Sequence, residues 1–202
     1  MRIELPELER PAKLTFDSGQ RLTDDEYFEF CMANPEVRFE RTSGGEIIIV
    51  PPAGLESSNQ SADLCHQLFK WNKRAKRGIV ADSSAEFILP DGAAYSPDAA
   101  FVSNEKLATL DQQQRKKFPP IAPDFVIEVL SPSDRLRPAQ SKMEQWTANG
   151  VQLGWLVDGK RQAVWIYRPH REPERLLAIA ELAGEGPVNG FVADLTGVWK
   201  GL

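Results

Sequence analysis

The sequence predicts an α/β or α+β fold in which a mixed central β-sheet is flanked by helices. Three observations indicate this class: an apolar run at residues 125–130, a helical apolar pattern over residues 58–77, and β-prone runs paired around glycine-containing turns. This order of helices and strands is typical of helices packed on a mixed sheet. The chain has 202 residues and is 42% hydrophobic, so we expect a single domain over residues 1–202.

The first elements are a short helix and an N-terminal hairpin. Thr23 and Glu26 form a capping-box pattern, which predicts a helix that ends before Asn34. Residues 37–42 and 46–50 are β-prone and flank Ser43-Gly44-Gly45, where glycine supplies the positive φ of a tight turn. We therefore expect a helix followed by a β-hairpin.

The main helix is expected over residues 58–77, with basic residues near its end and Gly78 as its C-cap. Short strands are expected next, at residues 79–81, 86–89 and 99–102. A charged insert at residues 104–117 is expected to be helical.

The second half of the chain predicts a strand, a helix and a hairpin. Residues 125–130 form a strand buried on both faces, which Glu128 alone interrupts. A helix beginning at Pro138 carries Lys142 and Trp146 and is closed by Asn149-Gly150; Trp146 is expected to fill the core. A hairpin over residues 151–157 and 163–167 follows, and further strands are expected at residues 176–179 and 191–195.

Composition restricts the class of function. The formal net charge of -5 counts against non-specific nucleic-acid binding, although basic residues cluster at residues 70–77 and 115–117. Two cysteines, Cys31 and Cys65, suggest neither a disulfide framework nor a zinc site. The N-terminal segment lacks a signal-peptide pattern and no apolar stretch reaches membrane-spanning length, so we expect a cytoplasmic protein without a membrane partner.

A pair of acidic residues is the best candidate for a metal site. Asp98 follows Pro97 at the start of a predicted strand, and Glu128 lies inside the most apolar strand, where an unpaired carboxylate is costly. Mg²⁺ prefers a few carboxylate oxygens plus waters, and the main-chain carbonyl of Val129 offers one more ligand. Lys142 follows on the next helix and can reach back to orient water or stabilise developing charge.

Each of these residues also has a purely structural interpretation. Asp98 could cap a turn, Glu128 could form an ion pair and Lys142 could be an exposed helix residue. The spacing alone is a loose pattern that predicts a metal site only weakly.

Three stretches of the sequence carry a resemblance to a known family. Residues 96–100 (Ser-Pro-Asp-Ala-Ala), 123–129 (Pro-Asp-Phe-Val-Ile-Glu-Val) and 142–156 are similar to the Uma-type putative restriction endonuclease family of the PD-(D/E)xK nuclease superfamily. The resemblance implies a restriction-endonuclease-like core in which Asp98 and Glu128 are the motif acids. Glu40, in the first hairpin, matches a further family acid.

The sequence departs from the superfamily pattern at one position. The lysine expected two residues after Glu128 is Leu130 here, and the resemblance implies that Lys142 supplies it from the next helix. The catalytic residues implied are thus Asp98, Glu128, Lys142 and Glu40.

The activity implied is hydrolysis of DNA phosphodiester bonds by water, with Mg²⁺ as cofactor and Mn²⁺ as a substitute. DNA would be the partner and a homodimer the assembly, and no organic cofactor is expected. Two other functions stay open: a non-catalytic DNA-binding or oligomeric interaction module, and a phosphodiesterase of small nucleotides.

Overall fold

The computed structural model describes residues 12–14, 21–132 and 134–201. Their backbone contacts group into two compact units. The first unit comprises the described residues of Met1–Pro52, Glu86–Ser96 and Asp111–Ile121, and the second those of Ala53–Ala85, Pro97–Leu110 and Ala122–Leu202. The single domain expected from chain length stays a prediction. Most of the N-terminal segment searched for a signal peptide lies outside the described residues.

The first unit is an antiparallel sheet with one helix. Its strands, in the order β1-β3-β2-β6-β5, are β1 (Ala12–Leu14), β3 (Ile47–Val50), β2 (Arg38–Arg41), β6 (Ala94–Tyr95) and β5 (Phe87–Ile88), and its helix is α1 (Asp24–Met32). The capping box between Thr23 and Glu26 is present and begins α1 as predicted. The predicted β2–β3 hairpin is present too, with Glu40 paired to Ile48.

The buried side chain of Arg41 connects separate segments of the first unit. Its guanidinium donates hydrogen bonds to the carbonyl oxygens of Gly92, Leu22 and Thr23, and it lies over the ring of Tyr27 at 4.7 Å. A fully buried charge is tolerated where its donors are satisfied in this way.

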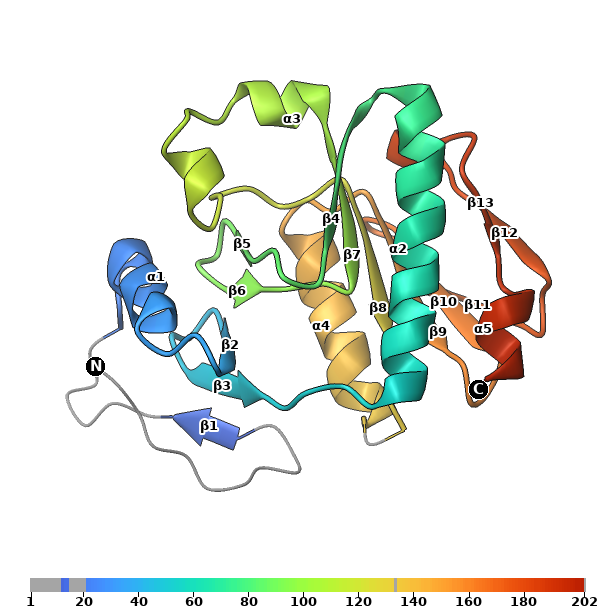
Figure 1. Cartoon of the computed structure of the whole chain (residues 1–202), viewed down its shortest axis with the longest axis horizontal. Coiled ribbons are helices and arrows are strands. Elements are labelled where there is room, and N and C mark those ends of the chain that lie inside the picture. The colour runs from blue at the N-terminus through green and yellow to red at the C-terminus, as the bar shows by residue number, and fades with distance from the viewer. Residues whose placement is uncertain (1–11, 15–20, 133, 202) are drawn as a thin grey trace. The chain divides into compact units, whose positions relative to one another are not determined.

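The second unit is built on a mixed sheet, as the sequence predicts. The strand order is β11 (Glu174–Leu177), β10 (Ala163–Tyr167), β9 (Leu153–Asp158), β8 (Phe125–Val129), β7 (Ala99–Ser103) and β4 (Gly78–Asp82). Strands β8 and β9 are parallel, and the other neighbours are antiparallel. A two-stranded sheet of β12 (Glu181–Ala183) and β13 (Val192–Asp194) belongs to the same unit (Figure 1).

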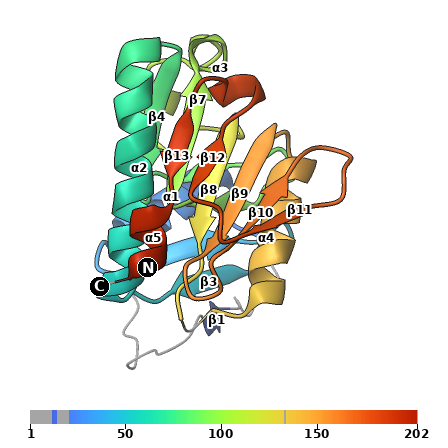
Figure 2. The same cartoon turned by 90° about the vertical axis from the view of Figure 1, so that its right-hand side faces the viewer.

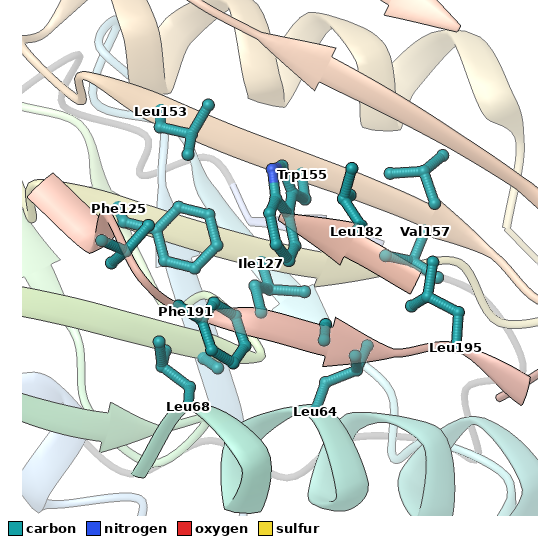
Figure 3. Close-up of a cluster of buried hydrophobic side chains, with 14 of the residues drawn as sticks. Leu64, Leu68, Phe125, Ile127, Leu153, Trp155, Val157, Leu182, Phe191 and Leu195 are labelled. Carbon is teal, nitrogen blue, oxygen red and sulfur yellow. The ribbon is translucent and has the colours of Figure 1, made fainter. Parts of the chain in front are cut away.

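Two helices cover opposite faces of this mixed sheet (Figure 2). Helix α2 (Leu55–Ala75) packs over β4, β7 and β8, and helix α4 (Leu136–Ala148) packs on β9 and β10. On the α2 face, Leu64 and Leu68 point towards Ile127 and Phe191 in one buried cluster (Figure 3). Alternate residues of β8 therefore point towards α2, and Glu128 points towards α4.

The predicted C-cap of the main helix was wrong. Lys76, with φ 54°, holds the left-handed position, and Gly78 begins β4 instead. A Cβ at Gly78 would lie 2.0 Å from the carbonyl oxygen of Val102, so the glycine serves close strand pairing. Glycine is common both after the end of a helix and at close contacts between strands, so its presence alone does not distinguish the two positions.

Other boundaries differ from the sequence-based expectation. The main helix starts at Leu55, and the insert at residues 104–117 is a short helix α3 (Asn104–Ala108) followed by a 3-10 turn at Gln114–Lys116. Strands β6 and β12, the 3-10 turn at Gly186–Val188 and helix α5 (Thr196–Lys200) were not expected. Across the described ranges, no helix is long and apolar enough to cross a membrane.

Candidate active site

Asp98 lies at the edge of the paired region of β7. Ala99 pairs with Ile127 of β8, and the antiparallel register carried one residue further places Asp98 opposite Glu128. Residues directly opposite in such a pair project from the same face of the sheet. The Oδ2 atom of Asp98 accepts a hydrogen bond of 2.7 Å from the backbone N–H of Val129. This bond ties the aspartate to the strand position next to Glu128.

Glu128 lies on the same face and is held by helix α4. Its Oε1 atom is 2.9 Å from the Nζ atom of Lys142 and accepts a hydrogen bond of 2.9 Å from the indole Nε1 of Trp146. The side chains of Glu128 and Lys142 are 14% and 21% exposed, so this ion pair is largely removed from solvent. A buried carboxylate is stable when it has such charged and polar partners.

The spacing of residues on α4 explains why two side chains reach one carboxylate. Lys142 and Trp146 are four residues apart, so they lie on the same face of the helix. Gly154 of β9 faces this helix: a Cβ there would lie 2.4 Å from the terminal methyl of Met143, so an added side chain would displace that methyl.

The donors at this position match the preferences of Mg²⁺. Two carboxylates from neighbouring strands and the Val129 backbone are hard oxygen donors, and Mg²⁺ commonly takes one or two carboxylates and keeps several waters. Among the described residues, there is no cluster of three or more histidine, cysteine, aspartate or glutamate side chains that could hold a metal. Oxygen donors of this kind suit Mg²⁺ rather than zinc, which favours cysteine and histidine ligands.

Glu40 belongs to the first unit. It is 7% exposed, and its Oε1 atom accepts a hydrogen bond of 3.4 Å from the backbone N–H of Ser96. Its charge also acts on the buried carboxyl of Glu86, which accepts a hydrogen bond of 2.6 Å from the hydroxyl of Tyr27. The role of Glu40 as a fourth catalytic residue stays a prediction.

Two residues of interest escaped the sequence reasoning. Trp146 is fully buried, as expected of a core residue, but its N–H is also directed at Glu128. The spacing of four from Lys142 was the signal that could have revealed it. The pairing of Glu86 with Tyr27 spans 59 residues and has no local signature.

The model of the Uma2 family, described as putative restriction endonuclease, matches residues 24–195. The chain belongs to this family. Glu40, Asp98, Glu128 and Lys142 all lie within this matched range, and the family description supports a nuclease that acts on DNA.

A solved structure supports the fold independently. The crystal structure of a putative nuclease belonging to DUF820 from Anabaena variabilis superposes with a TM-score of 0.71 at 22% identity, covering 89% of this chain and 98% of that one. The restriction-endonuclease-like mixed sheet predicted for this Uma2 member agrees with that likeness. A search of curated proteins found no match.

Proposed function

We propose that the chain is a metal-dependent DNA endonuclease that hydrolyses phosphodiester bonds at Asp98, Glu128 and Lys142. The observation that carries the proposal is the 2.9 Å ion pair between Glu128 on β8 and Lys142 on α4. It lies next to Val129, whose backbone N–H donates a hydrogen bond to Asp98. The Uma2 family match and the nuclease-like fold support the same class of reaction.

Each residue has a distinct task. Asp98 and Glu128 would hold Mg²⁺ together with the Val129 carbonyl, and Mn²⁺ would substitute. When bound, the cation would supply Lewis-acid polarisation of the phosphate and activation of water. Lys142 would orient the attacking water and stabilise charge on the phosphoryl oxygens. The water oxygen would bond to phosphorus and release a proton to solvent, the bond from phosphorus to the leaving sugar oxygen would break, and that oxygen would take up a proton from solvent.

The test separates charge from structure. Asp98→Asn and Glu128→Gln keep an oxygen that can accept the hydrogen bonds from Val129 and Trp146 but remove the negative charge that a cation needs. Glu144→Gln is the matched control, because Glu144 is an exposed carboxylate on the same helix as Lys142. Calorimetry with Mg²⁺ and Mn²⁺ would run beside a plasmid-nicking assay.

We expect wild type and the control to bind the cation and nick plasmid, and both site variants to lose the two properties together. Metal-independent binding of DNA without nicking would instead support the non-catalytic module, which the exposed basic residues Lys70, Lys73 and Arg74 on α2 favour. Cleavage of nucleotides but not of plasmid would indicate the small-nucleotide phosphodiesterase. Homodimer formation and a cytoplasmic location stay predictions from the sequence.

A further inference from the structure

We propose that Trp146 is a positioning residue that fixes the Glu128 carboxylate for cation binding through its indole N–H. The inference rests on the proposed function, because it assigns a task within the same site. It goes beyond that function, since the proposed set of Asp98, Glu128 and Lys142 gives Trp146 no task.

The contact itself is well defined. The Nε1 atom of Trp146 lies 2.9 Å from Oε1 of Glu128, a normal hydrogen-bond distance, and the tryptophan is 0% exposed. A fully buried indole ring has little freedom to rotate, so the direction of its N–H is set by the packing of α4. The indole N–H therefore has a fixed direction relative to the Glu128 carboxylate.

The charge of the donor distinguishes Trp146 from Lys142. Both bonds end on the same oxygen, Oε1, so together they fix the rotation of the carboxyl group. The ammonium of Lys142 would repel a cation bound to Glu128. The neutral N–H of Trp146 carries no such charge, so it can hold the carboxylate in place while the cation is bound.

A simpler interpretation is that Trp146 only fills the core. Trp146→Phe tests this, because phenylalanine keeps an aromatic ring and removes the N–H. The matched control is Trp199→Phe, since the indole of Trp199 also donates, at 2.6 Å, to the carbonyl of Ile179 rather than to Glu128. Both variants lose one indole hydrogen bond in the same unit, and only one loses it at the site.

The first measurement is Mg²⁺ affinity by calorimetry, with urea unfolding of each variant alongside. Loss of a group that orients a metal ligand typically weakens metal binding by about 10- to 100-fold. We expect this weakening in Trp146→Phe and wild-type affinity in Trp199→Phe. A folded Trp146→Phe protein with wild-type affinity would overturn the proposal.

The second measurement needs no variant of Trp146 and holds even if that variant fails to fold. In ¹⁵N-labelled full-length protein, the indole N–H resonance of Trp146 is expected to shift when Mg²⁺ is added and again in Glu128→Gln, while that of Trp199 stays in place. A Trp146 resonance that ignores saturating Mg²⁺ would refute the inference. If wild type binds no Mg²⁺ at all, the proposed function fails as well as this inference. If wild type binds Mg²⁺ but the Trp146 resonance does not shift, only this inference fails.

Discussion

Replacing Glu86 by glutamine should remove a specific pH dependence of stability. Glu86 is 6% exposed and accepts a hydrogen bond of 2.6 Å from Tyr27. Burial raises the pKa of Glu86 from its ordinary 4.5 to about 8, and the charge of Glu40 adds to the rise. The bond from Tyr27 and the charges of Arg38 and Arg41 oppose it without cancelling it. The folded protein therefore keeps this carboxyl protonated at neutral pH.

The magnitude follows from the linkage between protonation and folding. The unfolded chain ionises Glu86 above pH 4.5, whereas the folded chain does so only near pH 8, so the folded state binds the extra proton between these values. The free energy of unfolding should fall by about 1.4 kcal/mol per pH unit in this interval. Above this interval it should level off, after a total loss of about 5 kcal/mol.

The assay is urea unfolding at half-unit steps from pH 4 to pH 9 for wild type and Glu86→Gln. Glutamine can still accept the hydrogen bond from Tyr27 but does not titrate, so the difference between the two curves isolates one group. The reactivity of the buried Cys31 thiol, which packs in the same cluster as Tyr27, reports opening of the first unit. Parallel stability curves for the two proteins would refute the reasoning.

Three further changes give sharp outcomes. Arg41→Met leaves carbonyl oxygens without their buried donor, so the free energy of unfolding should fall by about 3 kcal/mol or more, measured by urea unfolding. Gly154→Ala brings a Cβ to 2.4 Å from the Met143 methyl and should lower the free energy of unfolding by about 1 to 3 kcal/mol. In the double variant with Met143→Ala, the loss should be smaller than the sum of the two single losses, and strict additivity would exclude this contact as the cause. Lys142→Met should abolish nicking but leave Mg²⁺ affinity equal or higher in calorimetry, because the removed ammonium lies 2.9 Å from Glu128; weaker binding would contradict this.

Local signals made much of the fold predictable. The capping box at Thr23, the apolar run of β8 and the hairpin of β9 and β10 each depend on residues close in sequence, and each element is present. Strands of two or three residues, such as β6 and β12, carry too little periodicity to be recognised. They exist because partner strands from elsewhere in the chain complete them.

The first unit shows a different limit of sequence reasoning. It is assembled from three separate segments, and its buried contacts join residues such as Tyr27 and Glu86 across 59 positions. No pattern within either segment predicts that Tyr27 and Glu86 are hydrogen-bonded to each other. Glu86 looked like an ordinary residue at the start of a strand, whereas its environment makes it a neutral acid at neutral pH.

The position of the lysine has a physical reason. A lysine two residues after Glu128 would stand in place of Leu130, which is 8% exposed, and burying an ammonium there would be costly. Lys142 instead reaches Glu128 from α4 and stays 21% exposed, so its ammonium pairs with the carboxylate without being fully buried. Because Trp146 lies one turn further on the same helix, any shift of α4 along the sheet displaces both donors of the carboxylate together.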